Sequence, residues 1–117
     1  MIWILTQVAI GGALGSVLRF VTVSLIGGPV ATLTVNVLGS LVMGVLAVTL
    51  VNRAHLSPLL MTGVLGGFTT FSAFSLDALK LYEGGQTGHA LIYIAGSVLI
   101  SLAAVALGAA LARGALA

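Results

Sequence analysis

The chain has 117 residues, of which 60% are hydrophobic and only 5% are charged. A membrane-spanning helix takes roughly 20 apolar residues, so this length holds about four spans and leaves no room for a soluble catalytic domain. Four scattered basic residues against two acidic ones do not form the basic cluster that nucleic-acid binding needs, and the absence of cysteine excludes disulfides, thiolate metal sites and a cysteine nucleophile.

This composition predicts an all-α integral membrane protein with four spans, which form a single domain over residues 1–117. We expect the first span at about 2–26. It begins without the basic residues of a signal peptide and continues beyond signal-peptide length, so we interpret it as a retained helix. Two glycines at 27–28 end it, and Pro29 suits the first turn of a second helix at about 29–51.

The third span, expected at about 57–82, contains the most informative segment of the chain. Ser57 and Pro58 predict an N-cap and first-turn pair that opens it. Residues 66–74 read Gly-Gly-Phe-Thr-Thr-Phe-Ser-Ala-Phe, in which adjacent glycines loosen the backbone and threonines divert hydrogen bonds, so we expect a break near 66–71. Non-helical backbone at bilayer depth survives only when it is buried in protein or lines a polar cavity. The break therefore indicates an ion or substrate site.

The fourth helix is expected at about 88–112, with Arg113 at its interfacial end. Four spans place Arg53 and Arg113 on one side of the membrane, and Lys80 and Arg19 on the other. A chain with no Lys/Arg bias has no strong orientation signal, so copies can insert both ways and pair as an antiparallel, dual-topology dimer. The alternative is that four charges are too few to carry such a signal.

Polar residues inside the spans form two stripes in which every fourth residue is polar. Their hydroxyls, amide and phenol can donate hydrogen bonds to an anion without an embedded counter-charge that would hold it too tightly. The alternative for the serines and threonines is a bond to the carbonyl four residues back or to a neighbouring helix. An amide in hydrocarbon is harder to satisfy by accident, which favours a functional role for Asn36. The stripes are Thr32, Asn36 and Ser40 on the second helix, and His89, Tyr93, Ser97 and Ser101 on the fourth.

Small residues spaced by four are expected to let helices approach closely, either within the chain or between chains. Phe71 and Phe74 share a face if the helix resumes after the break, and the electropositive edge of a phenyl ring attracts an anion weakly; ordinary packing is the alternative. Asp77 would be costly against lipid, so we expect it to be paired or at a watery surface. The small pairs are Gly11–Gly15, Ser40–Gly44, Gly63–Gly67 and Gly108–Ala112.

Three segments resemble the Fluc/CrcB family of fluoride channels. Residues 66–74 resemble the third-helix signature of that family. Residues 11–20, Gly-Gly-Ala-Leu-Gly-Ser-Val-Leu-Arg-Phe, are similar to its first-helix GGxxGxxxR[YF] pattern, and residues 36–40 are similar to its second-helix Asn-x-x-Gly segment. The likeness covers all four helices in order and spacing. Ala73 departs from it, since the family often has threonine there.

The resemblance implies a passive, fluoride-selective channel that exports fluoride from a bacterial cytoplasm. The protein would be a multi-pass protein of the inner membrane and an antiparallel homodimer with two pores. Arg19 would lie in a vestibule, and a structural sodium ion at the dimer interface would bind the backbone carbonyls of Gly66 and Thr69. The implied fluoride pathway comprises Asn36, Thr70, Phe71, Ser72, Phe74, Tyr93, Ser97 and Ser101.

Two other classes of membrane protein remain as alternatives. A proton-coupled small multidrug exporter needs a membrane-embedded carboxylate, and residues 2–26 contain no Asp or Glu. A structural subunit of a larger membrane complex would leave the break and the polar stripes unexplained. We do not expect an enzyme, because His89 has no recognisable nucleophile partner or metal-ligand spacing.

Overall fold

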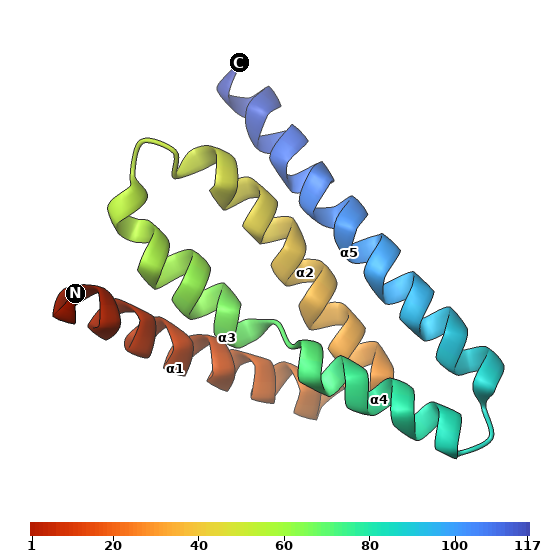
Figure 1. Cartoon of the computed structure of the whole chain (residues 1–117). Helices are drawn as coiled ribbons and strands as arrows, with labels where there is room; N and C mark the ends of the chain where they lie inside the picture. Colours follow the sequence, from red (N-terminus) through yellow and green to blue (C-terminus); the bar gives the residue numbers. More distant parts are fainter.

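The computed structural model describes all residues, 1–117, and every regular element in it is helical (Figure 1). Four helical segments are long and apolar enough to cross a membrane: Ile2–Ile26, Gly28–Thr49, Ala54–Glu83 and Thr87–Leu116. The prediction of an all-α chain with four potential spans is therefore confirmed. The elements are α1 (Ile2–Ile26), α2 (Gly28–Thr49), the 3-10 helix η1 (Ala54–Leu56), the π-helix η2 (Pro58–Leu65), α3 (Gly66–Phe68), α4 (Phe71–Glu83) and α5 (Thr87–Leu116).

The helix ends differ from the predicted ones by a few residues, except for α1. The reversal into α2 is made by Gly27 and Gly28, whose φ angles of 76° and 70° lie in the left-handed region that favours glycine. The second helix consequently begins one residue before Pro29, and it ends at Thr49 instead of residue 51. The fourth helix is longer than predicted at its C-terminal end, because α5 continues past Arg113 to Leu116.

The third span corrects two details of the prediction. Ser57 occupies the predicted N-cap position before Pro58, but its side chain makes no capping hydrogen bond: its backbone is already helical, with φ −59° and ψ −43°, and its hydroxyl lies 3.3 Å from the sulfur of Met61. The 3-10 turn at Ala54–Leu56 precedes it, so the chain is coiled before Ser57 is reached. The break is also narrower than 66–71, because Gly66–Phe68 is helical and only Thr69 and Thr70 are extended.

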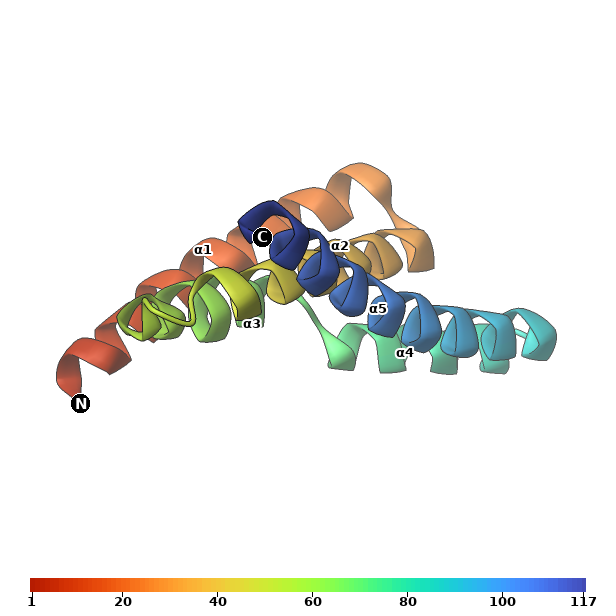
Figure 2. The same cartoon turned by 90° about the horizontal axis from the view of Figure 1, so that it is seen from above.

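Close backbone contacts within the chain decide which helices pair. Figures 1 and 2 show the first half of the third span beside α1, and α5 beside α2. A Cβ atom at Gly11 or Gly15 would overlap carbonyl oxygens of η2. A Cβ atom at Gly44 or Gly108 would likewise overlap carbonyl oxygens across the α2–α5 contact. These glycines are therefore used inside the chain, where they permit packing of backbone against backbone.

The interior of the folded chain is small. Only 17 of 117 residues are buried, and Val35 is the largest side chain that is fully enclosed. The molecule measures 49 × 34 × 23 Å, so it is flat in one direction, as Figure 2 shows. Most large apolar side chains consequently lie on the surface, where a membrane protein meets lipid or another chain.

Candidate functional site

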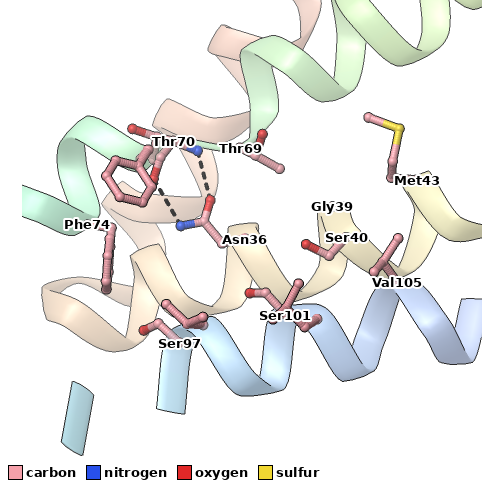
Figure 3. A pocket seen from close by; sticks show the side chains of 13 residues that line it. Asn36, Gly39, Ser40, Met43, Thr69, Thr70, Phe74, Ser97, Ser101 and Val105 are labelled. Carbon is pink, nitrogen blue, oxygen red and sulfur yellow. Dashed lines mark hydrogen bonds between the residues drawn. The ribbon is translucent and has the colours of Figure 1, made fainter. Parts of the chain in front are cut away.

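The break in the third span is held open by one side chain from α2. Asn36 accepts a hydrogen bond from the backbone N–H of Thr70 at 2.7 Å and donates through Nδ2 to the Thr70 carbonyl at 3.0 Å (Figure 3). One amide thus satisfies both backbone groups of an extended residue that is itself buried. The Thr70 hydroxyl then accepts from the N–H of Ala73 at 3.1 Å and so caps α4.

The same break frees backbone acceptors. Because the N–H of Thr70 donates to Asn36, it does not donate to the carbonyl of Gly66 four residues back. No hydrogen bond ends on the carbonyl of Thr69, whereas its N–H and its hydroxyl both donate to Leu65. The carbonyl oxygens of Gly66 and Thr69 therefore lack the donors that an unbroken helix would provide.

Three aromatic rings follow one another after the break. The rings of Phe71 and Phe74 meet edge to face, with centroids 5.3 Å apart and planes at 63°. The ring of Tyr93 on α5 also contacts Phe74, with centroids 5.3 Å apart. Phe74 is only 7% exposed, whereas Phe71 is 76% exposed and projects from the surface of the chain. The two phenyl rings thus lie in very different surroundings.

A pocket of about 360 Å³ lies between α2, α5 and the break (Figure 3). The structure brings together in its wall most of the residues that the sequence selected. Ser97 is notable among them, because its hydroxyl oxygen is buried and has no hydrogen-bond partner within the chain. The predicted residues that line the pocket are Asn36, Ser40, Thr69, Thr70, Phe71, Phe74, Ser97 and Ser101.

Other predicted residues lie outside this pocket. Tyr93 does not line it and donates to the carboxylate of Asp77 at 3.1 Å, so the prediction that Asp77 would be paired is confirmed. Ser72 is exposed and its hydroxyl lies 3.3 Å from that of Thr70. Arg19 is half-buried on α1 and also lies outside the pocket wall.

Sequence reasoning missed five residues that line the pocket. Gly39 is buried against the methyl group of Thr69, where a Cβ atom would overlap it. The others are apolar and were not distinguishable from lipid-facing residues by type. Val98 and Val105 lie three and four residues from Ser101, but apolar residues outside the pocket share that kind of spacing, and Met43 and Leu102 are not three or four residues from Asn36 or Ser101. They are Gly39, Met43, Val98, Leu102 and Val105.

The site offers neutral donors instead of charged groups. No three side chains of His, Cys, Asp and Glu come together in a way that would hold a metal ion. Hydroxyl and amide groups in an otherwise apolar wall suit a small anion that must also be released. A hard cation would have to depend on the freed backbone carbonyls at the break.

Comparisons with known proteins agree with this picture of a membrane protein. Residues 6–109 match the family described as CrcB-like protein, Camphor Resistance (CrcB). A protein of Paracoccus denitrificans named "Fluoride-specific ion channel FluC" is 52% identical over 116 residues, which cover 92% of this chain and 93% of that relative. A protein of the same name from Cereibacter sphaeroides is 54% identical over 121 residues, covering 97% of this chain and 98% of that relative.

Proposed function

The chain belongs to the CrcB-like family, and from this premise we propose that it is a passive ion channel selective for fluoride. The names of its relatives support the choice of fluoride as the transported ion. The observation that carries the proposal is the pocket beside the break, in which hydroxyl and amide donors adjoin two phenyl rings and no charged side chain lines the wall. We propose no enzymatic activity, and we place the protein as a multi-pass protein in the inner membrane of a bacterium.

The pathway that we propose uses donors that the fold leaves free. The amide nitrogen of Asn36 carries two hydrogens. One of them is donated to the carbonyl of Thr70, so the second remains for an anion. The hydroxyl of Ser97 has no partner within the chain and is equally available. Fluoride would exchange part of its water shell for these donors, and the electropositive ring edges of Phe71 and Phe74 would add weak attraction.

Tyr93, Ser72 and Arg19 take supporting roles in this proposal. Tyr93 packs on Phe74 and is held by Asp77, so it fixes that ring and continues the polar face of α5 beyond the pocket. Ser72 is exposed next to Thr70 at the start of α4. Arg19 would draw anions to a vestibule through its charge, since clefts with one sign of charge raise the local concentration of counter-ions.

We further propose that two antiparallel copies complete two pores. The exposed ring of Phe71 and the pocket that it adjoins would be covered by the second copy, and the balanced basic residues permit either orientation. A single chain with a small interior offers little enclosed volume of its own. Association would therefore turn an open pocket into a closed path.

A structural sodium ion is part of the same proposal. Gly66 and Thr69 would hold it through their carbonyl oxygens, which the break deprives of helical donors. Two such oxygens from each of two chains would supply four ligands of the kind that suits a hard cation. The ion would stabilise the interface, and its positive charge would favour anions nearby.

Efflux from liposomes tests the channel. The purified protein is reconstituted in vesicles loaded with fluoride, and release is recorded with a fluoride electrode while a potassium ionophore relieves the charge build-up. We expect rapid fluoride release and no comparable release of chloride from matched vesicles. If verified, folded protein releases no fluoride, the channel proposal fails and a structural subunit of a membrane complex becomes the better hypothesis.

Labelling tests the dual topology. The chain has no cysteine, so a single cysteine in place of Gln86, which is exposed in the loop between α4 and α5, gives one reporter. We expect a membrane-impermeant thiol reagent applied to whole cells to label about half of the copies, because two opposite insertions would be equally populated. Labelling of all or none of the copies would contradict the antiparallel dimer and leave a single orientation.

Removal of sodium tests whether the proposed ion stabilises the dimer. Exchange into potassium or N-methylglucamine buffers should weaken the dimer, and we expect more monomer on size exclusion at the same protein concentration. Restoring sodium should reverse the change. An unchanged dimer in thoroughly sodium-free buffer would refute the structural role of the ion.

A further inference from the structure

The hydroxyl of Ser40 is a polar group in the pocket wall to which the proposed pathway assigns no role. Ser40 is half-buried on α2, one turn after Asn36. The side-chain hydrogen bonds of α2 are made by Thr34, Asn36 and Thr49, and none of them involves Ser40. Both threonines donate to the carbonyl four residues back, which is the usual way for a hydroxyl in an apolar helix to be satisfied. The hydroxyl of Ser40 therefore remains free to donate into the pocket.

The packing of α2 on α5 fixes the level at which Ser40 lies. The two helices run in the same direction along the chain (Figure 1). A Cβ atom at Gly44 would overlap the carbonyl oxygen of Val105 and would lie 2.8 Å from the backbone nitrogen of Ala109, so Gly44 lies between these two residues of α5. Ser40 is one turn before Gly44, and one turn before Val105 is Ser101. Ser40 consequently lies beyond Ser101, at the approach to Val105.

Hydrogen-bond donors from the two helices therefore alternate along the pocket. Figure 3 shows them in the order Ser97, Asn36, Ser101 and Ser40. On α5 the next position after Ser101 in steps of four is Val105, whose side chain donates nothing, so Ser40 continues the line of donors where α5 stops. Positions four residues apart on one helix are separated by about 6 Å, and the donor of the other helix falls between them. An anion can thus exchange one donor for the next without losing all of them at once.

We propose that Ser40 and Ser101 bind fluoride at a second position, about one helical turn beyond the position held by Asn36 and Ser97. The inference rests on the proposed channel function and extends it. The backbone N–H groups of α2 and α5 are occupied by the helical ladder at this level, so the two hydroxyls supply the donors. Without them the ion would meet apolar side chains, among which a partly dehydrated charge is costly. Two neutral donors hold an anion without an embedded counter-charge, which permits its release.

Removal of the Ser40 hydroxyl tests this role. Ser40→Ala deletes one oxygen atom and places a good helix former in α2, so the variant should fold. We expect the rate of fluoride efflux from liposomes to fall about fivefold, the effect of one hydrogen bond of about 1 kcal/mol. The thermal midpoint should remain that of the wild type, because no intramolecular hydrogen bond is deleted. Thr34→Val is the matched control: it also removes a hydroxyl from α2, but that hydroxyl donates to the carbonyl of Val30 and lies outside this pocket.

Ser97→Ala, measured in the same series, removes a hydroxyl from the other end of the pocket. Slower efflux from Ser40→Ala, with an unchanged thermal midpoint and normal efflux from Thr34→Val, supports the second position. Unchanged or faster efflux from Ser40→Ala overturns it, and slower efflux from Ser97→Ala would then show that the channel proposal still stands. A loss of efflux that comes with a lower thermal midpoint, or that Thr34→Val shares, assigns Ser40 to packing and also overturns the second position. A wild type that does not conduct overturns the channel itself, and the second position falls with it.

Discussion

The two halves of the third span differ in what they pack against and in how they do so. Before the break, η2 and α3 lie against α1, and Gly63 and Gly67 let their backbones touch those of α1 directly. After the break, α4 lies against α5 through a phenyl ring and a hydrogen-bonded carboxylate. The first half leaves no room between helices, whereas the second adjoins a pocket with polar walls.

The two halves of the third span therefore have different roles. The glycine contacts form a rigid scaffold that fixes where the break occurs, because the helix cannot rotate or slide without overlap of backbone atoms. The break then turns the chain so that Asn36 can bind Thr70 and α4 can begin beside the pocket. Substitutions in the first half should therefore act on stability, and those in the second half on conduction as well.

The largest effect is expected from Gly15→Ala in the scaffold. The added methyl would overlap the carbonyl oxygen of Val64, which is backbone and cannot move aside, so we expect destabilisation of about 3 kcal/mol. The measurement is the thermal midpoint and monodisperse yield of the detergent-solubilised protein. Gly12→Ala is the control, because a Cβ atom at Gly12 meets nothing within 4 Å. Equal stability of the two variants would contradict the assignment of the scaffold.

Asn36→Leu should give the next largest effect and should lower both the stability of the protein and its fluoride conduction. The apolar side chain leaves the N–H and the carbonyl of buried Thr70 without partners, which costs about 2 kcal/mol, and it removes a donor from the pocket. We expect a lower thermal midpoint and at least a tenfold loss of fluoride efflux, an order of magnitude that one hydrogen bond to an ion accounts for. Asn36→Asp keeps the acceptor for Thr70 and should recover part of the stability. Full efflux from Asn36→Leu would remove this residue from the pathway.

Tyr93→Phe should have a smaller effect, because it removes one hydrogen bond and keeps the ring on Phe74. Loss of the donor to Asp77 is expected to cost about 1 kcal/mol. A double-mutant cycle with Asp77→Ala measures the interaction energy of the pair. In this cycle the effects that each substitution has on its own are subtracted from the effect of the double substitution. A coupling energy of zero would mean that this contact does not stabilise the protein.

Ser97→Ala should change stability least, yet still slow conduction. Its hydroxyl has no partner within the chain, so its removal deletes no intramolecular hydrogen bond, and we expect the free energy of unfolding to change by less than the ~1 kcal/mol that one hydrogen bond contributes. The measurement is the thermal midpoint. Fluoride efflux should nevertheless fall several-fold, because a donor to the ion is lost. Marked destabilisation with unchanged efflux would show instead that Ser97 serves packing.

Much of the site was predictable because polar residues are rare in apolar spans. The stripes on α2 and α5 placed Asn36, Ser40, Ser97 and Ser101 on faces that do meet in the pocket. The same reasoning could not find Met43 or Val105, since the type of an apolar residue in a membrane helix does not show whether it faces a pocket or lipid. It also grouped Tyr93 with the serines, whereas in the structure Tyr93 lies outside the pocket wall and donates to Asp77.

The sequence by itself determined the class, the four spans and the presence of a break, because these follow from apolar length and from local backbone preferences. Only the tertiary structure decided where the break narrows to Thr69 and Thr70, since Gly66 and Gly67 are helical there despite their weak propensity. Contacts of α1 with the glycine backbone before the break, and the amide of Asn36 after it, override that propensity. Propensity is a property of a short segment, whereas these contacts join residues 34 or more positions apart in the chain.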